Sequence, residues 1–168
     1  MRITDASGQV LELEVLGYQF PDHRSKQETR EKAIAGGLIG RPSAERWDAN
    51  WLVIRGYVQT SRGSWKFEDP CLETWEARSL CDCLTRVAAG EPNERLDFIE
   101  PNLAFNVASP RNDAQLVGVV VEFGLEARPP WSSPEVFEQS PVNFDFRRTD
   151  LAQAAADLAG ELDRYPER

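Results

Sequence analysis

The segment at residues 115–126, QLVGVVVEFGLE, constrains the fold more than any other stretch of the chain. Its apolar side chains alternate with others and form the longest apolar face in the sequence: Val117, Val119, Val121, Phe123 and Leu125. A period of two is typical of a β-strand that buries one face. Leu116 and Val120 lie on the opposite face. We therefore expect a central strand with neighbours on both sides.

Six further segments have the alternation or composition of strands. They are residues 10–18, 50–60, 64–69, 95–99, 102–108 and 142–146. The segment 50–60 has apolar side chains on both faces, which predicts a strand covered on both sides. Ser61, Arg62 and Gly63 are expected to form a hairpin loop in which Gly63 supplies a positive φ. Several links are too short for a parallel crossover, so the strands are predicted to pair mostly antiparallel.

Two segments, 73–89 and 150–163, have apolar residues at helical spacing. We expect Thr74 and Thr149 to be their N-caps and Gly90 to end the first helix. With about seven strands, the predicted class is α+β. The expected architecture is a mostly antiparallel, strongly twisted sheet or incomplete barrel with two packed helices.

The length of 168 residues suits one domain with a sound core, and we expect residues 1–168 to form it. Residues 23–46 break the strand pattern, because charged residues are mixed there with glycines and a proline. Ser25 followed by Glu28 could begin a short helix, but only Ala33 and Ile34 offer apolar surface. We therefore expect a polar, mobile insertion at about residues 23–46.

The residue types that bind metals or act as nucleophiles are scarce. His23 is the only histidine, and Cys81 and Cys83 are two apart on a predicted helix, which turns them to different faces. No phosphate-binding glycine motif follows a strand. The sequence therefore predicts no metal site, no cofactor and no catalytic nucleophile.

A six-residue pattern, Phe-x-acid-Pro-x-Leu, occurs twice, as FEDPCL at residues 67–72 and FIEPNL at 98–103. Asp69 and Glu100 could be the paired carboxylates of a hydrolase. Proline gives a simpler explanation, because it restrains the preceding residue and cannot donate to a strand ladder. We interpret both segments as strand-ending corners, with Asp69 serving the start of the first helix and Glu100 a bend between strands. The hydrolase is the less favoured alternative.

The net charge of −9 is concentrated after residue 63, where the chain contains ten Lys and Arg residues but twenty Asp and Glu residues. Such acidity disfavours nucleic acid and anionic membranes and favours a basic protein partner, although solubility alone would also explain it. No stretch is apolar for the 18 or so residues that a membrane span needs, and we see no secretory signal. The expected location is the cytoplasm.

Six segments, taken in order, carry a family resemblance. They are 11–22 (LELEVLGYQFPD), 47–56 (WDANWLVIRG), 64–76 (SWKFEDPCLETWE), 96–105 (LDFIEPNLAF), 119–131 (VVVEFGLEARPPW) and the closing helix that ends in DRYPER at 163–168. As a set they resemble the WapI-type immunity proteins, which accompany wall-associated contact-dependent toxins of bacteria. The resemblance implies a non-enzymatic, cytoplasmic protein that binds and neutralises the C-terminal toxin domain of its cognate partner, commonly a nuclease acting on tRNA.

We expect an acidic contact surface for a basic toxin domain, with Trp131, which follows two prolines, as an aromatic anchor. The acids expected in that surface are Glu91, Glu94, Asp97 and Asp113. A structural or regulatory domain with an unknown partner is the alternative that uses the same scaffold. The sequence does not determine the oligomeric state.

Overall fold

The computed structural model of the chain describes residues 1–21, 48–91, 95–110, 113–132 and 139–168. The described strands form two four-stranded antiparallel sheets. The first sheet, in the order of the chain, consists of β1 (Arg2–Thr4), β2 (Val10–Tyr18), β3 (Trp51–Thr60) and β4 (Gly63–Glu73). The second consists of β5 (Arg95–Asp97), β6 (Leu103–Pro110), β7 (Leu116–Phe123) and β8 (Ser140–Arg147).

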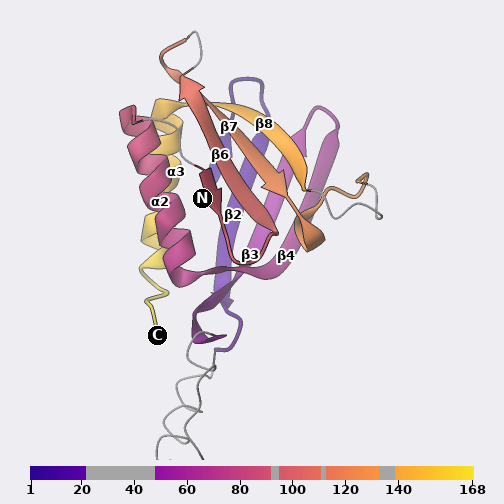
Figure 1. The fold of residues 1–168 in the computed structure, drawn as a ribbon, viewed down its shortest axis with the longest axis vertical. Helices are drawn as coiled ribbons and strands as arrows, with labels where there is room; N and C mark the ends of the chain where they lie inside the picture. Colours follow the sequence, from indigo (N-terminus) through magenta and orange to yellow (C-terminus); the bar gives the residue numbers. More distant parts are fainter. Residues whose placement is uncertain (22–47, 92–94, 111–112, 133–138) are drawn as a thin grey trace, which may run out of the picture.

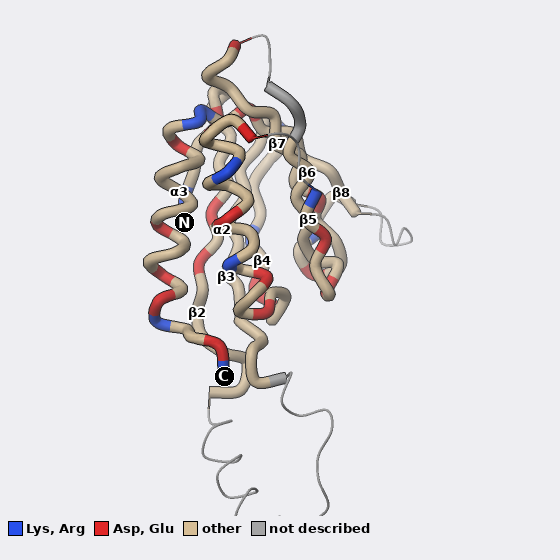
Figure 2. The backbone as a smooth tube through the Cα atoms, turned by 60° about the vertical axis from the view of Figure 1, so that its left-hand side comes forward, with Lys and Arg blue, Asp and Glu red and all other residues tan. Residues whose placement is uncertain are grey.

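The described helices are α2 (Thr74–Ala89), α3 (Arg148–Leu162) and two single-turn 3₁₀ helices, η1 (Asp48–Asn50) and η2 (Leu125–Ala127). Figures 1 and 2 show α2 and α3 side by side along one side of the sheets. One continuous hydrophobic core joins the two sheets and the two α-helices. Its largest side chains come from both sheets and both helices and include Phe105, Phe123, Phe144, Phe146, Leu13, Leu52, Leu80 and Leu151.

The predicted α+β class is confirmed, but the strands form two sheets rather than one. Helix α2 follows β4 directly, so the chain leaves the first sheet before it starts the second. The sheets meet at one corner, where the backbone N–H of Ala6 donates to the carbonyl oxygen of Asp145 at 2.9 Å. Strand β1 was not expected from the sequence, because three residues are too few to show a period.

The central position of β7 is confirmed, since it pairs with β6 on one side and β8 on the other. Val117, Val119, Val121 and Phe123 are buried as predicted. The prediction for Leu125 was wrong. The strand ends at Phe123 and the chain turns into η2, where Leu125 is 40% exposed and has a φ of 44°.

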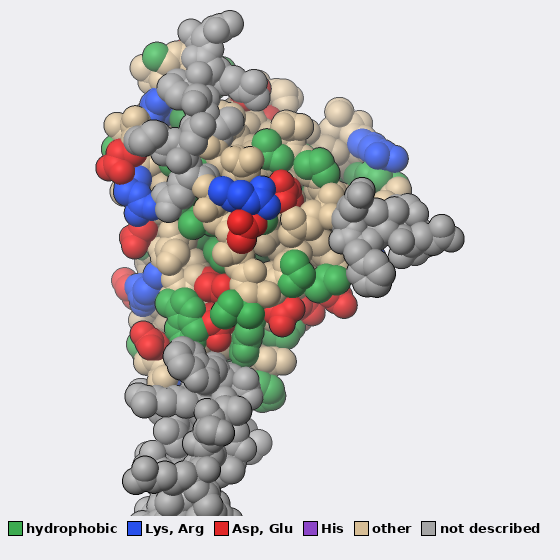
Figure 3. Space-filling view, viewed as in Figure 1, with side chains coloured by type: hydrophobic (Ala, Val, Ile, Leu, Met, Phe, Trp, Pro, Cys, Tyr) green, Lys and Arg blue, Asp and Glu red, His purple; other side chains and the backbone are tan. Residues whose placement is uncertain are grey.

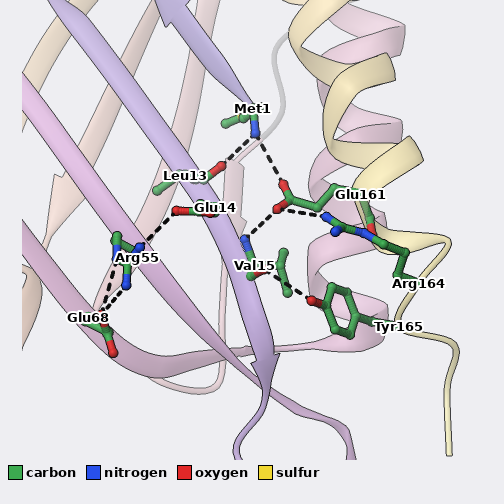
Figure 4. Close-up of polar contacts among 9 residues, drawn as sticks. All are labelled: Met1, Leu13, Glu14, Val15, Arg55, Glu68, Glu161, Arg164 and Tyr165. Atoms are coloured by element: carbon green, nitrogen blue, oxygen red, sulfur yellow. Dashed lines mark hydrogen bonds and ion pairs between the residues drawn. The ribbon is translucent and has the colours of Figure 1, made fainter.

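The expectation that β3 is covered on both faces was also wrong. Its inner residues are buried, whereas Trp51, Val53 and Tyr57 on the outer face are only half-buried. Arg55, in the middle of that face, is exposed and forms ion pairs with Glu14 at 3.3 Å and Glu68 at 3.2 Å (Figure 4). The outer face therefore has paired charges where a covering layer was expected.

Strand β4 is longer than predicted, and FEDPCL lies inside it. Asp69 pairs with Ile54 and Pro70 pairs with Val53, so neither residue ends the strand. Proline is tolerated because β4 is an edge strand, where one side of the backbone needs no ladder partner. Asp69 therefore does not serve the start of α2, which begins four residues after Pro70.

The predicted N-caps were wrong and the predicted C-cap is confirmed. Glu73 caps α2 in a capping box with Glu76, and the Thr74 hydroxyl instead donates to Asn50 Oδ1 at 3.2 Å. The N-cap of α3 is Arg147 rather than Thr149. Gly90 ends α2 with a φ of 101°, and Gly63 in the hairpin has a φ of 150°, as the loop prediction required.

The C-terminal end of α3 and the residues that follow it contact the part of β2 that is not paired with β1 (Figure 4). Glu161 Oε1 accepts the backbone N–H of Val15 at 3.1 Å, and its Oε2 lies 3.5 Å from the N-terminal ammonium of Met1. The Tyr165 hydroxyl donates to the Val15 carbonyl oxygen at 3.4 Å. These contacts cover the backbone groups that an edge strand would otherwise expose.

The insertion predicted at about 23–46 and its possible helix start at Ser25 lie outside the described residues. Among the helices in the described part of the chain, none is long and apolar enough to cross a membrane.

Candidate functional site

Two turns meet at one end of the second sheet. The first, residues 98–102, joins β5 to β6, and the second, residues 124–127, follows β7. Pairing of Leu103 with Phe123 places the turns next to each other. The backbone N–H of Gly124 donates to the Asn102 carbonyl oxygen at 2.9 Å, which holds the two turns together.

The first of these turns is also attached to the start of α2 through a buried carboxylate. Glu76 is 8% exposed, and its Oε2 accepts the backbone N–H of Glu73 at 2.9 Å. Its Oε1 accepts the backbone N–H of Ile99 at 2.7 Å. One side chain therefore completes a helix cap and fixes a turn 23 residues further along the chain.

The carboxylates of Asp69, Glu126 and Glu100 lie near one another, and the first two accept hydrogen bonds from the buried amide of Asn102. Its Nδ2 donates to Asp69 Oδ2 at 3.2 Å and to Glu126 Oε2 at 3.3 Å. Burial raises the pKa of Asp69, and the charges of Glu126 and Glu100 raise it further. Within the described part of the chain, none of the three carboxylates forms an ion pair.

The structure thus brings Asp69 and Glu100 near each other, as the hydrolase hypothesis required, and adds Glu126 and Asn102, which sequence reasoning missed. A spacing of 57 residues between Asp69 and Glu126 leaves no local signal that the two side chains meet. A carboxyl group whose pKa is raised beside other carboxylates can hold a proton or attract a cation. No group of three or more metal-ligating side chains suited to a metal ion occurs among the described residues.

Replacing Asp69 with asparagine should raise the melting temperature at pH 7. The folded state disfavours the Asp69 carboxylate, so above its pKa the charge costs stability, and the variant removes that cost. The Asn102 hydrogen bond survives, because the new amide oxygen can accept it. The gain should shrink as the pH falls toward the ordinary aspartate pKa of 3.8, where the wild-type carboxyl is itself protonated.

Asp5 provides the matched control, because its change to asparagine should act in the opposite direction. Burial would raise the pKa of Asp5, but hydrogen bonds from Gln9 and Ser7 outweigh it and hold the pKa below its usual value. Its carboxylate therefore stabilises the fold above that pKa, and Asp5→Asn should lower the melting temperature at pH 7. Thermal melts of both variants across pH check the two signs, and shifts of the same sign would contradict the electrostatic explanation.

Three of the acids predicted from the sequence lie at or near the ends of three different elements. Glu91 follows α2 and lies 3.7 Å from Arg86, while Asp97 ends β5 and lies 2.8 Å from Arg95. Asp113 precedes β7 and accepts the backbone N–H of Gln115 at 2.9 Å. Glu94 lies outside the described residues. Their role in partner contact stays a prediction.

Trp131 lies in the wall of a hollow of about 570 Å³ between the β3–β4 hairpin and β8. Its half-buried ring packs edge-on against Trp65, with ring centres 5.4 Å apart, and the Arg62 guanidinium lies 5.6 Å from its centre. The Trp65 Nε1 donates to the Ala127 carbonyl oxygen at 2.9 Å, which connects this wall to η2.

A comparison with protein families matches residues 2–166 to the Immunity protein WapI-like family. The chain belongs to this family. The resemblance expected from the six ordered segments is therefore confirmed. Among curated proteins, none matches the chain.

Membership of the WapI-like family accounts for the scaffold of this chain. The segments that carried the resemblance contribute to strands β2 to β7 and to the turns between them, as far as the structure describes them. Most of their apolar residues are buried, as are those of α3. The shared pattern is therefore a pattern of core and corners, and the surface that meets a partner has to be sought among the exposed residues.

Proposed function

We propose that this WapI-like chain is a cytoplasmic immunity protein of a bacterial contact-dependent toxin system, which binds and neutralises the toxin domain of its cognate partner. The observation that carries the proposal is the family match over residues 2–166. Immunity proteins generally act by binding and without catalysis, so we assign no reaction and no cofactor to the carboxylates around Asn102.

The charge of the chain supports a basic partner. The net charge of −9 is concentrated after residue 63, which is the part that forms both helices and the second sheet. A nuclease toxin presents basic surface to its nucleic-acid substrate, and an acidic protein can cover that surface. A nuclease domain is therefore the toxin class that we propose, and nucleic acid and membranes are not the partners that we expect.

In this proposal the acids Glu91, Glu94, Asp97 and Asp113 raise the rate of encounter through long-range attraction. The partial pairing of Glu91 with Arg86 and of Asp97 with Arg95 limits their contribution to affinity, because exposed pairs are screened by water and salt. Trp131 is proposed as an anchor site that receives a partner side chain in its hollow.

The direct test first asks whether a gene for a large secreted protein adjoins the gene of this chain, and then uses the C-terminal domain of that protein. The purified domain should form a complex with the chain, and co-expression of the chain should abolish the growth inhibition that the domain causes. We expect the association rate to fall about tenfold or more between 50 and 500 mM salt. Absence of a complex would leave the structural or regulatory role, and a rate independent of salt would rule out steering by the acids.

A further inference from the structure

Large apolar side chains are exposed on both of the neighbouring turns. Ile99 is 64% exposed and Leu125 is 40% exposed. The third such side chain among the described residues, Phe20, lies elsewhere, at the end of β2. Figure 3 shows apolar side chains interleaved with acidic ones on the lower part of the described surface. Exposed apolar side chains that lie beside charged groups on neighbouring turns are typical of a protein interaction site.

The same turns carry carboxylates that the described structure does not neutralise. Glu100 follows Ile99 and Glu126 follows Leu125, and both charges act on the half-buried Asp69. The Arg128 side chain lies close by, and its Nε donates to the Leu125 carbonyl oxygen at 3.2 Å. Figure 2 shows acidic positions on the turn after β5 and on the neighbouring first turn of α2.

The fold gains little from these side chains. Leu125 has a φ of 44°, in the left-handed region that is unfavourable for a residue other than glycine. Asparagine or glycine would fit that conformation better. Like charges at Asp69, Glu100 and Glu126 repel one another. Residues that lower stability and also expose apolar surface are best explained by contact with another molecule.

We propose that the turn patch, defined as Ile99, Glu100, Pro101, Leu125 and Glu126, is the centre of the contact with the toxin domain. The patch fits a basic protein surface that presents an apolar side chain encircled by lysines or arginines. Ile99 and Leu125 hold the partner through apolar contact, and the carboxylates select its basic groups. This inference rests on the proposed function and goes beyond it by naming the residues at the centre of the contact.

The patch is held rigid before the partner arrives, which lowers the entropy lost on binding. Glu76 fixes the Ile99 backbone at 2.7 Å, and Asn102 fixes the Glu126 carboxylate at 3.3 Å. Gly124 and Asn102 join the two turns at 2.9 Å. The exposed side chains therefore stand on backbone that the core has already positioned.

The test compares two double variants with the wild-type chain for binding to the same purified toxin domain. Ile99→Thr/Leu125→Asn removes the apolar contacts, and we expect affinity to fall about 10- to 100-fold, mainly through faster dissociation. Glu100→Gln/Glu126→Gln removes two charges, and we expect affinity to fall about tenfold, mainly through slower association at low salt. Both variants should melt at or above the wild-type temperature, because each removes an unfavourable feature of the folded state.

The charge-matched control is Asp82→Asn/Asp157→Asn, which neutralises two exposed acids on the outer faces of α2 and α3. Its affinity should stay within about threefold of wild type. If the wild-type chain binds the toxin domain and both patch variants bind equally well, the patch is not the interface, although the proposed function stands. If the wild-type chain binds no toxin domain, the proposed function fails and the inference fails with it. A purified chain that dimerises through Ile99 and Leu125 would also overturn the inference.

Discussion

Replacing Gly124 with alanine is expected to destabilise the fold by about 3 kcal/mol or more, at the upper end of overpacking effects. A Cβ atom at this position would lie 2.1 Å from the carbonyl oxygen of Pro101. The φ of −114° at Gly124 is open to any residue, so the effect is steric rather than conformational. The neighbouring atom belongs to the backbone, so the two turns would have to separate. Their hydrogen bond between Gly124 and Asn102 would then break.

Thermal unfolding should show this loss as a fall in the melting temperature of about 6–12 °C for a chain of this size. Gly160→Ala is the matched control. Gly160 is exposed in α3, and an added Cβ there meets no atom within 4 Å. That substitution should stabilise the protein by about 0.4–1 kcal/mol, because alanine loses less freedom in a helix. Similar melting temperatures for the two variants would show that the contact between the turns does not constrain the fold.

Replacing Glu76 with alanine is expected to cost about 2–4 kcal/mol, because it leaves two backbone donors without their acceptor. Glu76 is buried, and its two oxygens accept the N–H groups of Glu73 and Ile99. The loss should weaken the α2 capping box and release the turn at 98–102 together. Urea unfolding would measure the cost, and faster hydrogen exchange at the Ile99 amide would show that the turn is affected.

Two further variants separate hydrogen bonding from charge. Glu76→Gln keeps one acceptor oxygen and places an NH₂ group against the second donor, so its cost should lie between those of wild type and Glu76→Ala. Asp82→Ala removes an exposed acid from the same helix and should change stability by less than about 0.5 kcal/mol. Equal unfolding free energies for Glu76→Ala and Asp82→Ala would contradict the role assigned to the buried carboxylate.

The fold was largely predictable where burial repeats along a strand or helix. Val117, Val119 and Val121 are buried as their alternation indicated, and α2 and α3 occur within two residues of the predicted bounds. Errors occurred where two neighbouring residues compete for one role. Glu73 caps α2 in place of Thr74, because its carboxylate shares the capping box with Glu76. Leu125 follows the period of β7, but the chain has already turned.

The candidate site was only partly visible in the sequence. The repeated hexapeptide predicted Asp69 and Glu100 as candidate residues. Asp69 accepts a hydrogen bond from Asn102, and the charge of Glu100 acts on Asp69. The interpretation of FEDPCL as a strand-ending corner was wrong, because this segment continues an edge strand. The interpretation of FIEPNL as a bend between two strands is confirmed, because it forms the turn between β5 and β6. Glu126 and the exposed Ile99 could not be assigned, since no pattern along the chain reports which turns meet.

The sequence by itself determined the class of the protein, the two helices, most strands and the family, because these depend on the order of apolar and polar residues within each segment. Tertiary structure decided that the strands divide into two sheets and that the turns at 98–102 and 124–127 lie together. It also decided that the carboxylates of Asp69 and Glu126 share one amide and that the charge of Glu100 acts on Asp69. The physical reason is that the order of apolar residues within a segment indicates which of its side chains are buried. Contacts between distant turns, in contrast, arise only when the two sheets pack.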